Sequence, residues 1–171
     1  MKSKIILFVA AALVLSGCSG PKVKIQETYN KDAGEGMVVG TLCIENKNYT
    51  DYTFKYSDDV PSINDYPNDS NMFTIQYGMP HFVVNKKAYF LFSIVKPAGK
   101  YKYYRVQALN YVGQEVKKLD VDMDIKFDVV PGKTTYLGQI NVNVDKKEFS
   151  VEDQIERDRT WFAKKVPQIQ F

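Results

Sequence analysis

Residues 119–129 alternate strictly between apolar and charged side chains, and this constrains the fold more than any other part of the chain. The odd positions are apolar and the even positions charged, in the order LDVDMDIKFDV. Successive side chains of a β-strand point to opposite faces, whereas a helix would need a period of 3.6 residues. The segment therefore predicts an antiparallel strand with one face on a core and one face in water.

Other segments show the same period of two, and turn residues separate them. They are residues 37–45, 52–56, 73–77, 101–109 and 135–144. Residues 88–95 are apolar almost throughout, as in a strand covered on both faces. We therefore predict a mainly β fold, an antiparallel β-sandwich of immunoglobulin-like or transthyretin-like type with about seven or eight strands.

The C-terminal residues change to a helical period. Apolar residues recur at helical spacing, at Val151, Ile155, Phe162 and Val166. Ser150 is a suitable N-cap, and Pro167 prevents continuation. We therefore predict one α-helix over about 151–165, packed on the sandwich or capping an open end.

The first residues have the pattern of a secretory signal. Lys2 and Lys4 flank the start of an apolar run, 5–15, that is shorter than the about 20 residues a membrane-spanning helix needs. The sequence Leu-Ser-Gly-Cys at 15–18 resembles the lipobox of bacterial lipoproteins at every position. The resemblance implies cleavage between Gly17 and Cys18, and attachment of diacylglycerol to the Cys18 sulfur.

This motif predicts both location and domain organisation. Two or three acyl chains such as palmitate anchor a protein firmly, since each buried methylene contributes about 0.8 kcal/mol. Ser19 after the cysteine resembles the enteric signal for the outer membrane. We expect a signal peptide over 1–17, a lipidated tether over 18–36 and a sandwich domain over 37–171 in the cell envelope, on either its periplasmic or its surface side.

Charge and composition exclude several functions. The net charge is +3, and removal of Lys2 and Lys4 with the signal peptide reduces it to +1, so nucleic acid is not an expected partner. A single His and two Cys disfavour zinc sites, His-based catalysis and disulfides. We expect no enzyme activity, no catalytic residue, no metal and no cofactor other than the lipid on Cys18.

Asp120, Asp122 and Asp124 form an Asp-x-Asp-x-Asp run that could indicate calcium. An EF-hand loop would need glycine and glutamate where this chain has Ile125 and Pro131. Alternate side chains of a strand stand about 6.5–7 Å apart and do not converge on one ion. The run therefore favours a solvated strand face, paired with lysines of the neighbouring strand.

Four other features leave alternatives open. The polar segment 57–71 could bind a cation or a partner, or could be a mobile hairpin insert. Cys43 lies in an apolar strand and favours a buried, inert thiol over a reactive one. His81 follows a turn and carries no catalytic motif. The tyrosines of the later strands favour sheet packing over an exposed ligand-binding strip: Tyr101, Tyr103, Tyr104, Tyr111 and Tyr136.

The order of these signals resembles uncharacterised bacterial lipoproteins with a transthyretin-like or carboxypeptidase-regulatory-like β-sandwich. The matching residues are the GMVVG opening at 36–40, the VKPAGKY turn at 95–101 and the FDVVPGKTTYLG stretch at 127–138. The resemblance implies a fold, and a sandwich by itself implies no activity.

These observations favour a lipid-anchored, non-enzymatic envelope protein that acts as a binding or assembly module. Its partners would be the membrane, through the anchor, and an envelope protein or glycan. The alternative is a surface adhesin or glycan-binding lipoprotein, for which Trp161 and the tyrosines would need to form one exposed patch. An envelope hydrolase using the 57–71 segment is less favoured.

Overall fold

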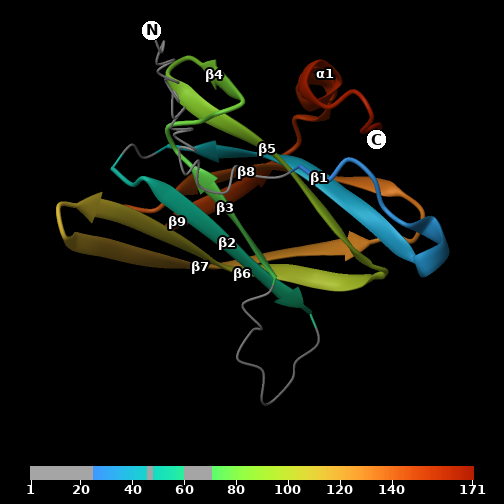
Figure 1. Cartoon of the computed structure of the whole chain (residues 1–171), viewed down its shortest axis with the longest axis horizontal. Coiled ribbons are helices and arrows are strands. Elements are labelled where there is room, and N and C mark those ends of the chain that lie inside the picture. The colour runs from blue at the N-terminus through green and yellow to red at the C-terminus, as the bar shows by residue number, and fades with distance from the viewer. Residues whose placement is uncertain (1–24, 46–47, 60–70) are drawn as a thin grey trace, which may run out of the picture.

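The computed structural model describes residues 25–45, 48–59 and 71–171 (Figure 1). Within these residues the chain forms nine strands, one short 3-10 helix and one α-helix. Their bounds are η1 Lys31–Ala33, β1 Glu35–Ile44, β2 Asp51–Asp58, β3 Met72–Gln76, β4 Phe82–Val84, β5 Lys87–Pro97, β6 Gly99–Val112, β7 Glu115–Val129, β8 Thr134–Asn143, β9 Glu148–Glu152 and α1 Ile155–Lys165.

The strands form two sheets, and the mainly β prediction is confirmed. Sheet A has the order β4-β5-β1-β8-β9, and sheet B has the order β3-β2-β6-β7. The predicted number of strands was too low, because β4 has only three residues and β9 overlaps the start of the predicted helix. One pair also departs from the antiparallel prediction, since β1 and β8 run parallel. Parallel neighbours need a long crossover, which here includes the whole of sheet B.

The main core lies between the two sheets and is rich in aromatic rings. Phe73 of β3 stacks on Phe54 of β2 and on Phe92 of β5, with ring centroids 5.4 and 5.7 Å apart. Tyr103 of β6 is fully buried and contacts several of these rings edge-on. The alternating tyrosines and phenylalanines therefore join the sheets.

Strand β7 has the predicted alternation. From Val121 to Val129 each odd residue is buried, and each even residue is exposed. A two-residue turn joins β6 to β7, and Val112 and Glu115 pair on either side of it. Gly113 occupies the first turn position with φ of 64°, a conformation that favours glycine.

A second core layer covers the outer face of sheet A. Phe162 of α1 is fully buried against Met37, Val39 and Leu91 of that face. Figure 1 shows α1 on the side of sheet A that faces away from sheet B. Strand β1 is therefore buried on both faces, which explains why residues 37–44 carry no charge on either face.

The helix begins later than predicted. It starts at Ile155 rather than near 151, and the residues expected in its first turn form β9, paired with β8. The prediction of Ser150 as N-cap was wrong: Gln154 is the N-cap, and Ser150 Oγ accepts a hydrogen bond from Asn141 Nδ2 at 3.1 Å. Pairing with β8 supplies hydrogen bonds that a helical turn would otherwise provide, so tertiary context decides the boundary.

The described residues before β1 lie against the domain. Ile25 and Tyr29 pack on the cluster around Phe162, and Gln26 bonds to Ser93 and to the backbone of Val95. In the described part of the chain no helix has the length and hydropathy to cross a membrane. Cys18, Gly17 and the rest of the predicted signal lie outside the described residues.

Candidate functional site

Most of the polar segment 57–71 lies outside the described residues, but its two ends are held by lysines. Asp59 lies 3.8 Å from Lys102 Nζ and 3.3 Å from Lys126 Nζ. Asn71 Oδ1 accepts a hydrogen bond from Lys96 Nζ. These contacts fix where the segment leaves and re-enters sheet B.

The aspartate row of β7 points into solvent and pairs across the ladder. Arg105 of β6 bonds to Asp122, with Nη2 2.8 Å from Oδ1, and Gln107 Nε2 donates to Asp120 at 3.1 Å. The aspartates do pair across the ladder, but the prediction of lysine partners was wrong, because the register places Arg105 and Gln107 opposite them. No group of three or more metal-ligating side chains occurs among the described residues.

Cys43 and His81 both lie within the packing of sheet A. Cys43 has no exposed surface, and burial raises the pKa of its thiol. His81 Nδ1 accepts a hydrogen bond from the backbone N–H of Leu91 at 3.1 Å. Burial, and then the charge of Lys165, lowers the pKa of His81, so its neutral form is favoured. Cys43 and His81 therefore contribute to the packing of sheet A.

The aromatic residues that the structure describes do not gather into one exposed patch. Tyr101 and Tyr103 are buried in the main core, and Tyr136 lies beneath Phe171. Tyr111 is exposed, but it lies on the β6–β7 hairpin of the opposite sheet from Trp161. The shared patch expected of a glycan-binding surface is therefore not formed by these rings.

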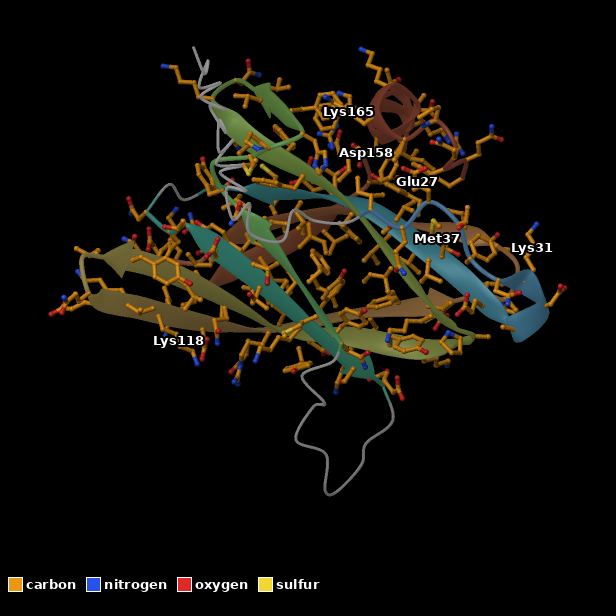
Figure 2. All side chains as sticks on the ribbon, in the orientation of Figure 1. Glu27, Lys31, Met37, Lys118, Asp158 and Lys165 are labelled. Carbon is orange, nitrogen blue, oxygen red and sulfur yellow. The ribbon has the colours of Figure 1, made fainter. Side chains whose placement is uncertain are left out.

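Sequence reasoning missed a buried carboxylate on α1. Asp158 has no exposed surface and lies between the helix and sheet A (Figure 2). Its Oδ2 accepts hydrogen bonds from Thr41 Oγ1 at 2.8 Å and from the Tyr136 hydroxyl at 2.7 Å. Its Oδ1 accepts from Arg157 Nε at 2.9 Å. Burial and the bond to Asp158 raise the pKa of Tyr136.

The guanidinium of Arg157 links this carboxylate to an aromatic cluster. Its central carbon lies 4.1 Å from the ring centre of Trp161 and 5.2 Å from that of Tyr89. Trp161 in turn stacks on Phe82 of β4, with centroids 4.6 Å apart. Both carboxylate oxygens of Asp158 have partners within the fold, so this group positions α1 on the sheet.

A second feature that the sequence did not indicate is an open seam between the sheets. Strand β7 contacts β1 and β8, so β9 extends beyond the edge of sheet B. A hollow of about 330 Å³ follows this seam, lined by residues 126–128 of β7 and 135–137 of β8, with Val38. Farther along β8, Phe149 and Val151 of β9 are 37% and 43% exposed, although the β8 residues paired with them are fully buried. We call this region, from β7 to β9, the open seam.

Comparison with known proteins gives no family. No family model matches the chain, and no curated protein matches it. A leucine-rich repeat protein from Bacteroides thetaiotaomicron VPI-5482 is similar in structure, with a TM-score of 0.40 and 12% sequence identity. The similarity covers 66% of this chain and 14% of that protein.

Proposed function

We propose that this chain is a lipid-anchored protein of the bacterial cell envelope that binds or assembles with a partner and catalyses no reaction. The observation that best supports this proposal is the Leu-Ser-Gly-Cys sequence ending at Cys18, after a basic start and a short apolar run. Acylation of Cys18 holds the domain at the membrane, and Ser19 favours the outer membrane.

The described surface supports binding rather than catalysis. The buried carboxylate Asp158 is engaged by Thr41, Tyr136 and Arg157 and lies under α1. The open seam, in contrast, presents apolar side chains such as Phe149 and Val151 beside a strand edge. An exposed apolar surface next to an unpaired edge is a recognised mode of protein recognition.

The anchor is tested by replacing each cysteine in turn. We expect Cys18→Ala to accumulate as uncleaved precursor that incorporates no labelled palmitate. Cys43→Ala is the matched control, since Cys43 is buried within β1, and it should be cleaved and labelled like the unmodified chain. Cleavage and labelling of the Cys18→Ala protein at the same site would contradict the proposal.

A further inference from the structure

We propose that the free edge of β7 accepts an extended segment of a partner protein, in which apolar residues alternate with basic ones. The segment would form a fifth strand of sheet B and fill the open seam beneath β9. This inference rests on the proposed binding function and specifies the chemistry of the partner.

The edge of β7 is long and unpaired. Within the described part of the chain β7, with 15 residues, is the longest strand, and its only ladder there is with β6. No backbone hydrogen bond among the described residues uses its other edge. The other edge strands are much shorter, with three residues in β4 and five in each of β3 and β9. Unpaired N–H and C=O groups along such an edge are a template for an added strand.

The sandwich lacks one strand at this position. Sheet A has five strands and sheet B has four, and β7 packs beneath β1 and β8. The register places Phe149 and Val151 opposite Val142 and Ile140, which are fully buried in the core. Phe149 and Val151 therefore face the interior side of sheet A, yet they are 37% and 43% exposed, so no described strand of sheet B covers them. Apolar side chains of an added strand would cover them.

The charges on β7 indicate which side chains the partner segment should carry on its solvent face. Its solvent face carries the row Asp120, Asp122, Asp124, Lys126 and Asp128. Asp120 and Asp122 have partners in sheet B, while Asp124 and Asp128 make no ion pair or hydrogen bond with a described residue. Opposite charges on neighbouring strands stabilise a pair, and like charges destabilise it. Basic residues on the solvent face of the incoming strand would form ion pairs with Asp124 and Asp128.

A second copy of this chain fits the edge less well. Because β9 extends past β7 in each copy, two β7 strands placed side by side would bring both β9 strands into the same space. A single extended segment meets no such conflict.

The experiment uses the full-length lipidated protein in detergent and a fluorescent nine-residue peptide of alternating valine and lysine. We expect saturable binding, measured by fluorescence anisotropy, with slowed hydrogen exchange across residues 115–129. A valine–glutamate peptide, and a peptide with the same valines and lysines in separate blocks, should not bind. Equal binding of either control, binding without protection of β7, or no binding would overturn the inference.

Two pairs of variants separate the charged and apolar contributions. The double variant Asp124→Lys, Asp128→Lys should weaken binding about tenfold, as expected for two exposed charge pairs. The matched control is Glu27→Lys, Asp32→Lys, two exposed acids outside sheet B, which should leave the affinity unchanged.

Phe149→Ser should also weaken binding, whereas Val84→Ser, an exposed residue on the opposite edge of sheet A, should not. Equal effects of a variant and its control would overturn the inference. So would a concentration-dependent dimer that protects residues 115–129 without peptide, because the edge would then belong to a second copy.

Failure of this inference can be distinguished from failure of the proposed function. Peptide binding in detergent does not depend on the anchor, and lipidation of Cys18 does not depend on β7. If the peptide does not bind, but the protein is lipidated and is crosslinked in cells to an envelope protein through other surfaces, this inference fails and the proposed function stands. If the peptide binds and Cys18 carries no lipid, the anchoring proposal fails and strand acceptance stands.

Discussion

The outer faces of the two sheets differ in whether their charged side chains are buried or exposed. On sheet A the carboxylate of Asp158 is fully buried under α1 and receives hydrogen bonds from Thr41, Tyr136 and Arg157. On sheet B, Asp122, Asp124 and Asp128 of β7 are exposed. The pair of Arg105 and Asp122 is open to solvent, with side chains 41% and 79% exposed.

Aspartate therefore has two different roles: buried in α1 it holds the helix on sheet A, and exposed on β7 it leaves the surface of sheet B open to contact. A buried charge must be fully compensated, so removing any partner is costly. An exposed pair is screened by water and contributes little. The outer face of sheet A, which we call the covered face, therefore keeps its contacts with α1. The outer face of sheet B, which we call the bare face, can exchange one partner for another.

The largest effect should come from Asp158. We expect Asp158→Ala to lower the free energy of unfolding by about 3–5 kcal/mol, because it leaves Thr41, Tyr136 and Arg157 without their common acceptor. Urea unfolding measures this loss. Tyr136→Phe is the milder control, since it removes one donor and should cost about 1–3 kcal/mol. If Asp158→Ala costs no more than an exposed substitution, the contrast between the two faces is wrong.

A smaller effect on the covered face should come from the only histidine. The folded state lowers the pKa of His81, so protonation favours the unfolded state, and stability is lost as pH falls through the ordinary histidine pKa of about 6.5. One such group changes the free energy of unfolding by at most about 1.4 kcal/mol per pH unit.

Unfolding measured between pH 7.5 and 5.5 should show this loss. His81→Asn keeps an acceptor for the Leu91 N–H and does not titrate, so its stability should be nearly constant over this range. An equal loss in both proteins would assign the pH dependence to other groups.

The smallest effect should come from the bare face. A double-mutant cycle of Arg105→Ala and Asp122→Ala should give a coupling of about 0.2–1 kcal/mol that decreases at high salt. A coupling as large as the loss in Asp158→Ala would remove the distinction between the faces.

Much of the sheet structure could be predicted because alternation is local. The strands at 119–129 and 88–95, the turn before Gly99 and the turn at Gly132 are where the sequence indicates them. The start of the helix could not be predicted, because Ser150 can cap a helix or pair in a strand, and only β8 decides between them.

The two sites could be predicted only in part. The exposed aspartate row follows from a period of two, so its solvent face was expected. The partners Thr41 and Asp158 are separated by 117 residues, and no spacing in the sequence brings them together. One available signal was the uncharged stretch 37–44, which indicates a strand covered on both faces and hence a covering element.

The period of the strands, the charge of each strand face and the motif at Cys18 can be read from the sequence, because each depends on residues close together in the chain. The parallel pairing of β1 with β8, the burial of Asp158 and the exposure of Phe149 and Val151 on β9 become visible only in the folded chain. These features depend on contacts between distant segments, and their free energy is set by burial and pairing after the chain has folded.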